Sequence, residues 1–137
     1  MDGPVTHELV NPEALSSAVG FSHAVVSAPG RMVFLAGQIG EGPDGVLVSD
    51  DLVAQFDAAC GNVATALAGA GGRPGDLVSM QIFVTDMAAY RANLKQIGEA
   101  WRRHFGKHYP AMGLFEVSAL VDADAWVELM GTAVIPD

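Results

Sequence analysis

Hydrophobic and polar positions follow two periods along this chain, one typical of strands and one typical of helices. In residues 77–85 apolar and polar side chains alternate, which predicts a strand with one apolar face. Further strands are predicted at residues 6–10, 22–28, 31–37, 112–120 and 126–135. The dipeptide Pro29-Gly30 is typical of a tight turn, so we expect the strands on either side of it to pair as a hairpin.

Two segments show the helical period instead. Asp50 or Asp51 can cap a first helix, and Asp86 can cap a second one. The apolar stripe of the first helix is Leu52, Phe56, Ala59, Val63 and Leu67, and that of the second is Tyr90, Leu94, Ile97, Trp101 and Phe105. The order β-β-β-α-β-α-β-β predicts an α+β fold in one domain, residues 1–137, with both helices on one face of a sheet.

The charge of the chain argues against two classes of partner. Sixteen acidic and seven basic residues give a net charge of −9 at pH 7. This field repels phosphate backbones and anionic lipids, and no apolar run reaches the length of about 20 residues that spans a membrane. We therefore expect no nucleic-acid partner and no membrane partner. The low charged fraction of 17% instead predicts that apolar surface is buried between subunits.

Cys60 is the only cysteine in the sequence. A single cysteine excludes an intrachain disulfide and favours a reducing, cytoplasmic location. Cys60 falls on the apolar stripe of the first helix, so we expect it to be buried and inert. No spacing of histidines and carboxylates predicts a metal site, and the glycine-rich stretches match no phosphate or dinucleotide motif.

Short motifs spread over most of the chain resemble, in their order, the Rid (reactive intermediate deaminase, YjgF/YER) family. They are Asn11-Pro12-Glu13, Gly20-Phe21-Ser22, Ala36-Gly37-Gln38, Phe83-Val84-Thr85-Asp86, Tyr109-Pro110-Ala111 and Val127-Glu128. The resemblance implies a chorismate-mutase-like fold and a homotrimer with ligand clefts between neighbouring subunits. It also implies hydrolysis of small-molecule enamines or imines without a metal or an organic cofactor.

The resemblance places Glu128 at the family's catalytic glutamate, which orients or deprotonates water for attack on an imine carbon. Alternation along the strand puts Val127 and Leu129 on the opposite face, so Glu128 would point to the sheet face that subunits share. Gly37 and Gln38 would shape the cleft. The glycine lets a ligand approach the backbone, and the glutamine offers both a donor and an acceptor.

Four positions depart from the family pattern in the same apolar direction. Met112 stands where the family has an arginine that grips a substrate carboxylate, and losing such a contact costs about 2–5 kcal/mol when the anion is buried. Phe21 replaces a tyrosine, Ala36 a serine, and Leu114 a cysteine or another small residue. The substrate is then expected to be larger and less anionic than a simple α-imino acid, or catalysis has been lost.

Other polar side chains could replace the missing contacts. His108 and Tyr109 precede Pro110 in the loop that would open the cleft, and either could bind substrate, although a loop histidine is more often incidental. Arg102 or Arg103 could act as a substitute anion clamp, and the simpler interpretation is that both are solvated charges at a helix end.

Three functions remain as hypotheses. The first is a Rid-like hydrolase or deaminase for an enamine, an imine or a related unsaturated nitrogen compound. The second is a non-catalytic trimer that senses or sequesters a small molecule. The third is RNA cleavage, an activity attached to the family, against which the acidic composition argues.

Overall fold

The computed structural model of the protein describes residues 6–137, and its centre is a four-stranded sheet. The strand order is β3-β6-β4-β5, with β3 (Gly30–Ile39), β6 (Val127–Pro136), β4 (Leu77–Val84) and β5 (Ala111–Glu116). β6 is antiparallel to both of its neighbours, whereas β5 is parallel to β4 because the chain returns between them through helices.

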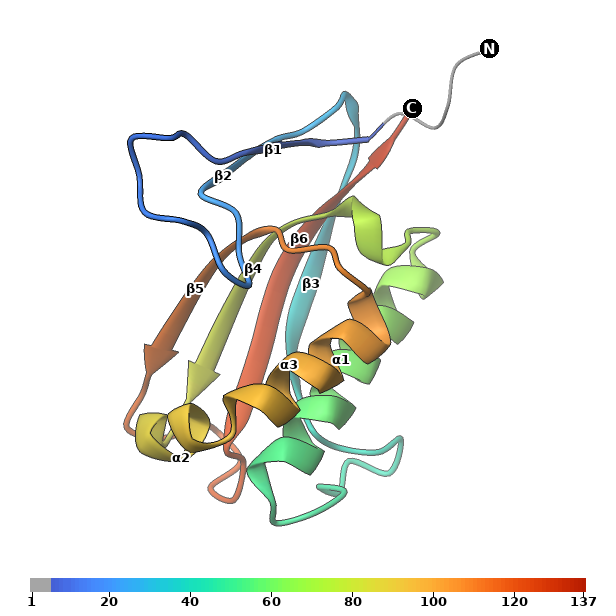
Figure 1. The fold of residues 1–137 in the computed structure, drawn as a ribbon. Coiled ribbons are helices and arrows are strands. Elements are labelled where there is room, and N and C mark those ends of the chain that lie inside the picture. Colours follow the sequence, from blue (N-terminus) through green and yellow to red (C-terminus); the bar gives the residue numbers. More distant parts are fainter. Residues whose placement is uncertain (1–5) are drawn as a thin grey trace.

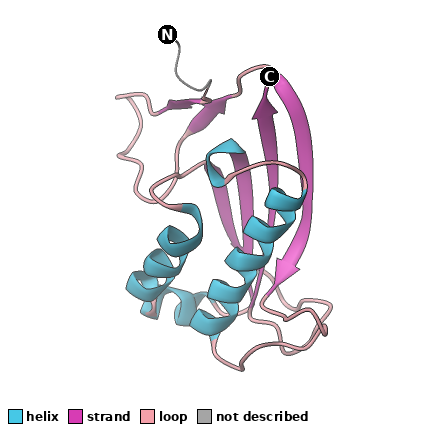
Figure 2. Cartoon of the chain, turned by 90° about the vertical axis from the view of Figure 1, so that its right-hand side faces the viewer, coloured by secondary structure: helices cyan, strands magenta, loops and turns pink. Residues whose placement is uncertain are grey.

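Helices cover one face of this sheet, as Figures 1 and 2 show. They are α1 (Leu52–Gly69), the short α2 (Met87–Ala92) and α3 (Leu94–Phe105). Asp51 caps α1 and Asp86 caps α2, each by accepting a hydrogen bond from a backbone N–H. The predicted α+β fold and element order are confirmed, but the second predicted helix is divided at Asn93 into α2 and α3. Within residues 6–137 no helix is long and apolar enough to cross a membrane.

The predicted hairpin around Pro29-Gly30 is wrong. β1 (Glu8–Val10) and β2 (Ala24–Val26) pair with each other in a separate sheet, while β3 pairs with β6. Gly30 serves a different purpose, because a Cβ added to it would stand 2.1 Å from the carbonyl oxygen of Ile135. The glycine therefore permits the close approach of β3 to β6 and does not make a turn. The strand predicted at 112–120 is also shorter and ends with β5.

The hydrophobic core lies between the helices and the sheet. Val127 and Leu129 of β6 are fully buried there, which confirms the predicted alternation along this strand. The opposite side of the sheet, which we call the outer face, carries exposed apolar side chains at Met32, Phe34, Phe115 and Met130. Phe34 is 76% exposed, so the described part of one chain leaves this face open around Phe34.

Two amide side chains of α1 hold the ends of the strands that carry the candidate site. Gln55 is fully buried, donates to two backbone carbonyls and accepts a 2.8 Å hydrogen bond from the Trp126 N–H, directly before β6. Asn62 donates to the carbonyl oxygens of Ile39 and Glu41 at 3.0 and 2.8 Å, at the end of β3. These bonds tie β3 and β6 to one helix and satisfy polar groups that are costly to bury alone.

Cys60 is fully buried on α1, as predicted. Burial raises the pKa of its thiol far above the usual range, and the nearby Asp57 carboxylate adds to the effect. In the unfolded chain the thiol ionises at about pH 8.5. Above that pH the unfolded state releases a proton that the folded state keeps, so stability falls as the pH rises.

We therefore expect Cys60→Ala to flatten the decrease in unfolding free energy between about pH 8 and pH 10, measured by urea denaturation. The slope with pH is compared, since the loss of side-chain volume lowers stability equally at every pH. A thiol reagent should label the wild-type protein only in denaturant. Rapid labelling under native conditions would contradict the buried position of Cys60.

Candidate functional site

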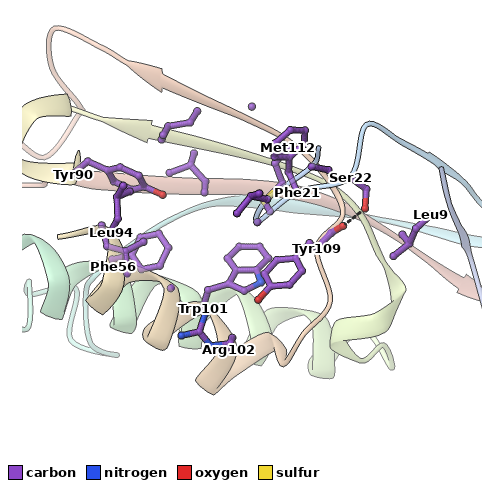
Figure 3. A pocket seen from close by; sticks show the side chains of 18 of the residues that line it. Leu9, Phe21, Ser22, Phe56, Tyr90, Leu94, Trp101, Arg102, Tyr109 and Met112 are labelled. Atoms are coloured by element: carbon purple, nitrogen blue, oxygen red, sulfur yellow. Dashed lines mark hydrogen bonds between the residues drawn. The ribbon is translucent and has the colours of Figure 1, made fainter. Parts of the chain in front are cut away.

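A cavity of about 880 Å³ lies on the helix side of the sheet, where α3, β5 and the segment before β2 meet (Figure 3). Its walls are mostly apolar and aromatic. Of the predicted site residues, the cavity brings together Phe21, Tyr109, Met112 and Leu114. Three of the four apolar departures from the family pattern therefore share one space within a single chain.

Hydrogen bonds to the backbone fasten the segment before β2 onto the start of β5. The Ser22 N–H donates to the Pro110 carbonyl at 3.0 Å, and the Ser22 hydroxyl donates to the Tyr109 carbonyl at 2.7 Å. The Tyr109 ring in turn stacks on Trp101 of α3, with ring centroids 6.4 Å apart. These contacts hold Phe21 and Tyr109 in place on the cavity wall.

The register of the sheet directs Met112 and Leu114 toward the helices. Met112 lies beside Met80 and Leu114 beside Ile82, and both of these β4 residues are buried in the core. Residues side by side in a sheet share a face, so the two β5 side chains enter the cavity from the sheet.

Glu128 lies on the other side of the sheet. It is paired with Ile39 in β3 and with Phe83 in β4, and it alternates with the buried residues of β6. Phe83 is stacked against Phe115, with centroids 5.9 Å apart. Glu128 therefore belongs to the outer face, and one chain does not bring it into the cavity with Met112.

The carboxylate of Glu128 lies against an irregularity in β3. The register shifts between Leu35 and Gln38, which inserts an extra residue at Ala36-Gly37. A Cβ added to Gly37 would stand 2.6 Å from Glu128 Oε2, so the glycine makes room for the carboxylate. Ala36 is exposed beside it, and the Gln38 amide donates to the Ala36 carbonyl at 3.4 Å. The irregularity in β3 thus brings together a second group of predicted site residues, namely Glu128, Ala36, Gly37 and Gln38.

The sequence and the fold are similar to those of known proteins. The family model described as Endoribonuclease L-PSP matches residues 11–135. The chain belongs to the Rid (YjgF, endoribonuclease L-PSP) family. This Rid chain is 30% identical to protein DfrA of Myxococcus xanthus over 118 residues, which cover 85% of this chain and 87% of DfrA.

Solved Rid-family structures resemble the chain over almost its whole length. YyfB from Yersinia pestis, a protein of unknown function of the conserved Rid family, is 31% identical with a TM-score of 0.87, covering 96% of this chain and 100% of its own. Rv2704 from Mycobacterium tuberculosis, a member of the YjgF/YER057c/UK114 family, is 33% identical with a TM-score of 0.63, covering 95% and 100%.

The remaining polar candidates of this Rid chain separate in space. His108 does not line the cavity. Its Nε2 lies 2.8 Å from the Leu77 carbonyl, and its own carbonyl accepts a hydrogen bond from the Trp101 indole. Arg102 lines the cavity, whereas Arg103 is bonded to the Asp57 carboxylate on α1.

Tyr90 and Trp101 also line the cavity. Both belong to the apolar stripe of the second predicted helix, which predicted only that they would pack in the core. Burial raises the pKa of Tyr90 to about 12, so its hydroxyl stays protonated and can donate a hydrogen bond. An apolar stripe on a helix looks the same whether it faces packed side chains or a cavity, and for that reason no local signal marks these two residues. Among residues 6–137 no group of three or more metal-ligating side chains comes together.

Proposed function

We propose that this Rid-family protein hydrolyses an enamine, an imine or a related unsaturated nitrogen compound, with Glu128 directing water or a proton. The position of the Glu128 carboxylate against Gly37 carries the proposal. Within residues 6–137 no hydrogen bond or ion pair occupies this carboxylate, and it lies on a face that no helix covers. A carboxylate that has no partner and is free to accept a proton suits general acid–base catalysis of water addition.

The cleft is proposed to lie between copies of the chain. Glu128 and the Met112 cavity are on opposite faces of one sheet, so a site that contains both needs the cavity of one subunit beside the outer face of another. The exposed apolar side chains of the outer face support such a contact, because a large apolar patch on a small domain marks an interaction surface. A homotrimer is the assembly that the family resemblance implies.

The proposed substrate is larger and more apolar than a simple α-imino acid. Phe21, Met112 and Leu114 line the cavity together, and Met112 cannot form the two-pronged bond that an arginine gives a carboxylate. Apolar surface favours an apolar body in the ligand by about 25 cal/mol for each Å² removed from water.

A hydrolysis assay tests the proposal. Imines are generated in the cuvette by an amino-acid oxidase, once from alanine and once from phenylalanine, and their disappearance is followed with and without the protein. We expect the protein to accelerate hydrolysis of the imine from phenylalanine more than hydrolysis of the imine from alanine. The absence of any acceleration over the buffer rate, across this pair and a set of enamines, would overturn the assignment as a hydrolase.

A non-catalytic binding trimer is the second candidate, and Met112 in place of an arginine favours it. Saturable binding of an imine mimic with no product formed would support this candidate. The matched family is described as an endoribonuclease, so the same preparation is tested for RNA binding. With a net charge of −9 we expect none, whereas salt-sensitive binding would support the RNA hypothesis.

A further inference from the structure

We propose that the cavity binds a ligand with an apolar body and one anionic group, and that Arg102 receives the anionic group. The proposal deepens the proposed function, on which it rests only in taking this ligand to be the substrate. It assigns the role of the family's arginine, which is absent at Met112, to a residue of α3 on a different wall of the cavity.

Arg102 is the available cation. It lines the cavity, and its guanidinium lies along α3, since a Cβ added to Gly98 would stand 3.1 Å from Nη1. Within residues 6–137 Arg102 forms no ion pair, whereas its neighbour Arg103 is bonded to Asp57, which also accepts from His104. An arginine keeps its charge at every physiological pH and bonds a carboxylate or phosphate with two parallel N–H groups.

Two tyrosine hydroxyl groups also line the cavity. Tyr109 stacks on Trp101, the residue before Arg102, and Figure 3 shows its hydroxyl turned toward α3. Tyr90 lines the same cavity, and its hydroxyl keeps its proton because burial of the side chain raises its pKa. By contrast, the indole N–H of Trp101 and the hydroxyl of Ser22 already donate to backbone carbonyls. The side-chain donors left for a ligand are thus Arg102, the two tyrosines and the Asn11 amide group, whose oxygen accepts from the His23 N–H.

The rest of the cavity calls for an apolar body. Its volume of about 880 Å³ is that of a pocket for a drug-sized ligand, and aromatic and aliphatic side chains make most of its wall. Arg102 on α3 and Met112 on β5 occupy opposite walls (Figure 3). An anionic group on Arg102 would therefore be separated by the apolar body from the end of the ligand that reaches β5. This arrangement distinguishes the ligand from a small α-imino acid, whose carboxylate is next to the reacting carbon.

The test uses a matched pair of probes, 3-phenylpropanoate and its neutral amide, 3-phenylpropanamide. Isothermal titration calorimetry measures the affinity of each probe for the intact protein and for Arg102→Gln. We expect the acid to bind the wild-type protein at least about tenfold more tightly than the amide, the factor for one charge-assisted hydrogen bond. Arg102→Gln should remove this preference and leave the amide affinity unchanged.

Arg103→Gln is the control, because it removes the same charge from the next position of α3, away from the cavity. It should bind both probes as the wild-type protein does. Equal affinity for acid and amide, no binding of either probe, or equal losses in the two variants would each overturn the proposal. If the acid binds through Arg102 but no imine is hydrolysed, the proposed function fails and this inference stands. If imines are hydrolysed and Arg102→Gln alters neither the affinity for the acid nor the KM, this inference fails and the proposed function stands.

Discussion

Replacing Glu128 with glutamine should lower kcat/KM for imine hydrolysis by about 10²–10⁴-fold, the contribution of one positioned acid–base group. Glutamine has nearly the same shape but cannot take or give a proton at neutral pH. The side chain lies on the sheet surface and not in the core, so the fold and the assembly should be unchanged. Steady-state kinetics gives the rate, and sedimentation velocity gives the assembly. A Glu128→Gln variant with wild-type kcat/KM would remove Glu128 from the mechanism.

Gly37→Ala separates the position of the carboxylate from its charge. The added Cβ would lie 2.6 Å from Glu128 Oε2, so the flexible end of the glutamate must move while its charge is kept. We expect a smaller loss of kcat/KM than in Glu128→Gln, with the pH profile retained. If Gly37→Ala is as active as the wild-type protein, the exact place of the carboxylate does not matter for the reaction.

Phe34→Asp should dissociate the proposed homotrimer. The outer face is proposed to be buried between copies, and Phe34 is its most exposed large apolar residue. Burying an unpaired carboxylate there costs several kcal/mol at each contact, and every 1.4 kcal/mol weakens association tenfold. Sedimentation velocity should show monomers with an unchanged circular dichroism spectrum, because the side chain makes little contact within its own chain. Hydrolysis should be lost with the assembly.

Val121→Asp is the matched control for Phe34→Asp. Val121 is a fully exposed apolar residue in the loop between β5 and β6, outside the strands of the sheet. The same change from apolar to acidic should leave the assembly intact there. A Phe34→Asp protein that sediments like the wild type would show that the outer face is not the contact between copies.

Local patterns in the sequence predicted the features that depend on local periodicity. The alternation of Val127, Glu128 and Leu129 is confirmed, because a strand with one buried face must alternate. The buried position of Cys60 is confirmed for the same reason, since a helix stripe faces the core. The roles of Glu128 and the other site residues come from the family resemblance, and they stay predictions until the variants are measured.

Features that depend on partners far along the chain were not predicted. The dipeptide Pro29-Gly30 predicts a turn, but glycine is needed at position 30 because the Ile135 carbonyl leaves no room for a side chain there. Met112 and Glu128 lie on opposite faces because of how β5 and β6 are each aligned with β4. The sequence of β5 or of β6 alone does not determine this alignment. His108 likewise bonds to Leu77, whose position is set by β4.

The two-sided sheet has a consequence for populations of mixed subunits. In the proposed assembly each cleft takes its carboxylate from one chain and its cavity from the next, so each active cleft requires two neighbouring chains. A subunit without a working Glu128 would still contribute a sound cavity to the cleft beside it. Two defective alleles of this protein, one damaged on each face, would then complement each other when expressed together, whereas two alleles damaged on the same face would not.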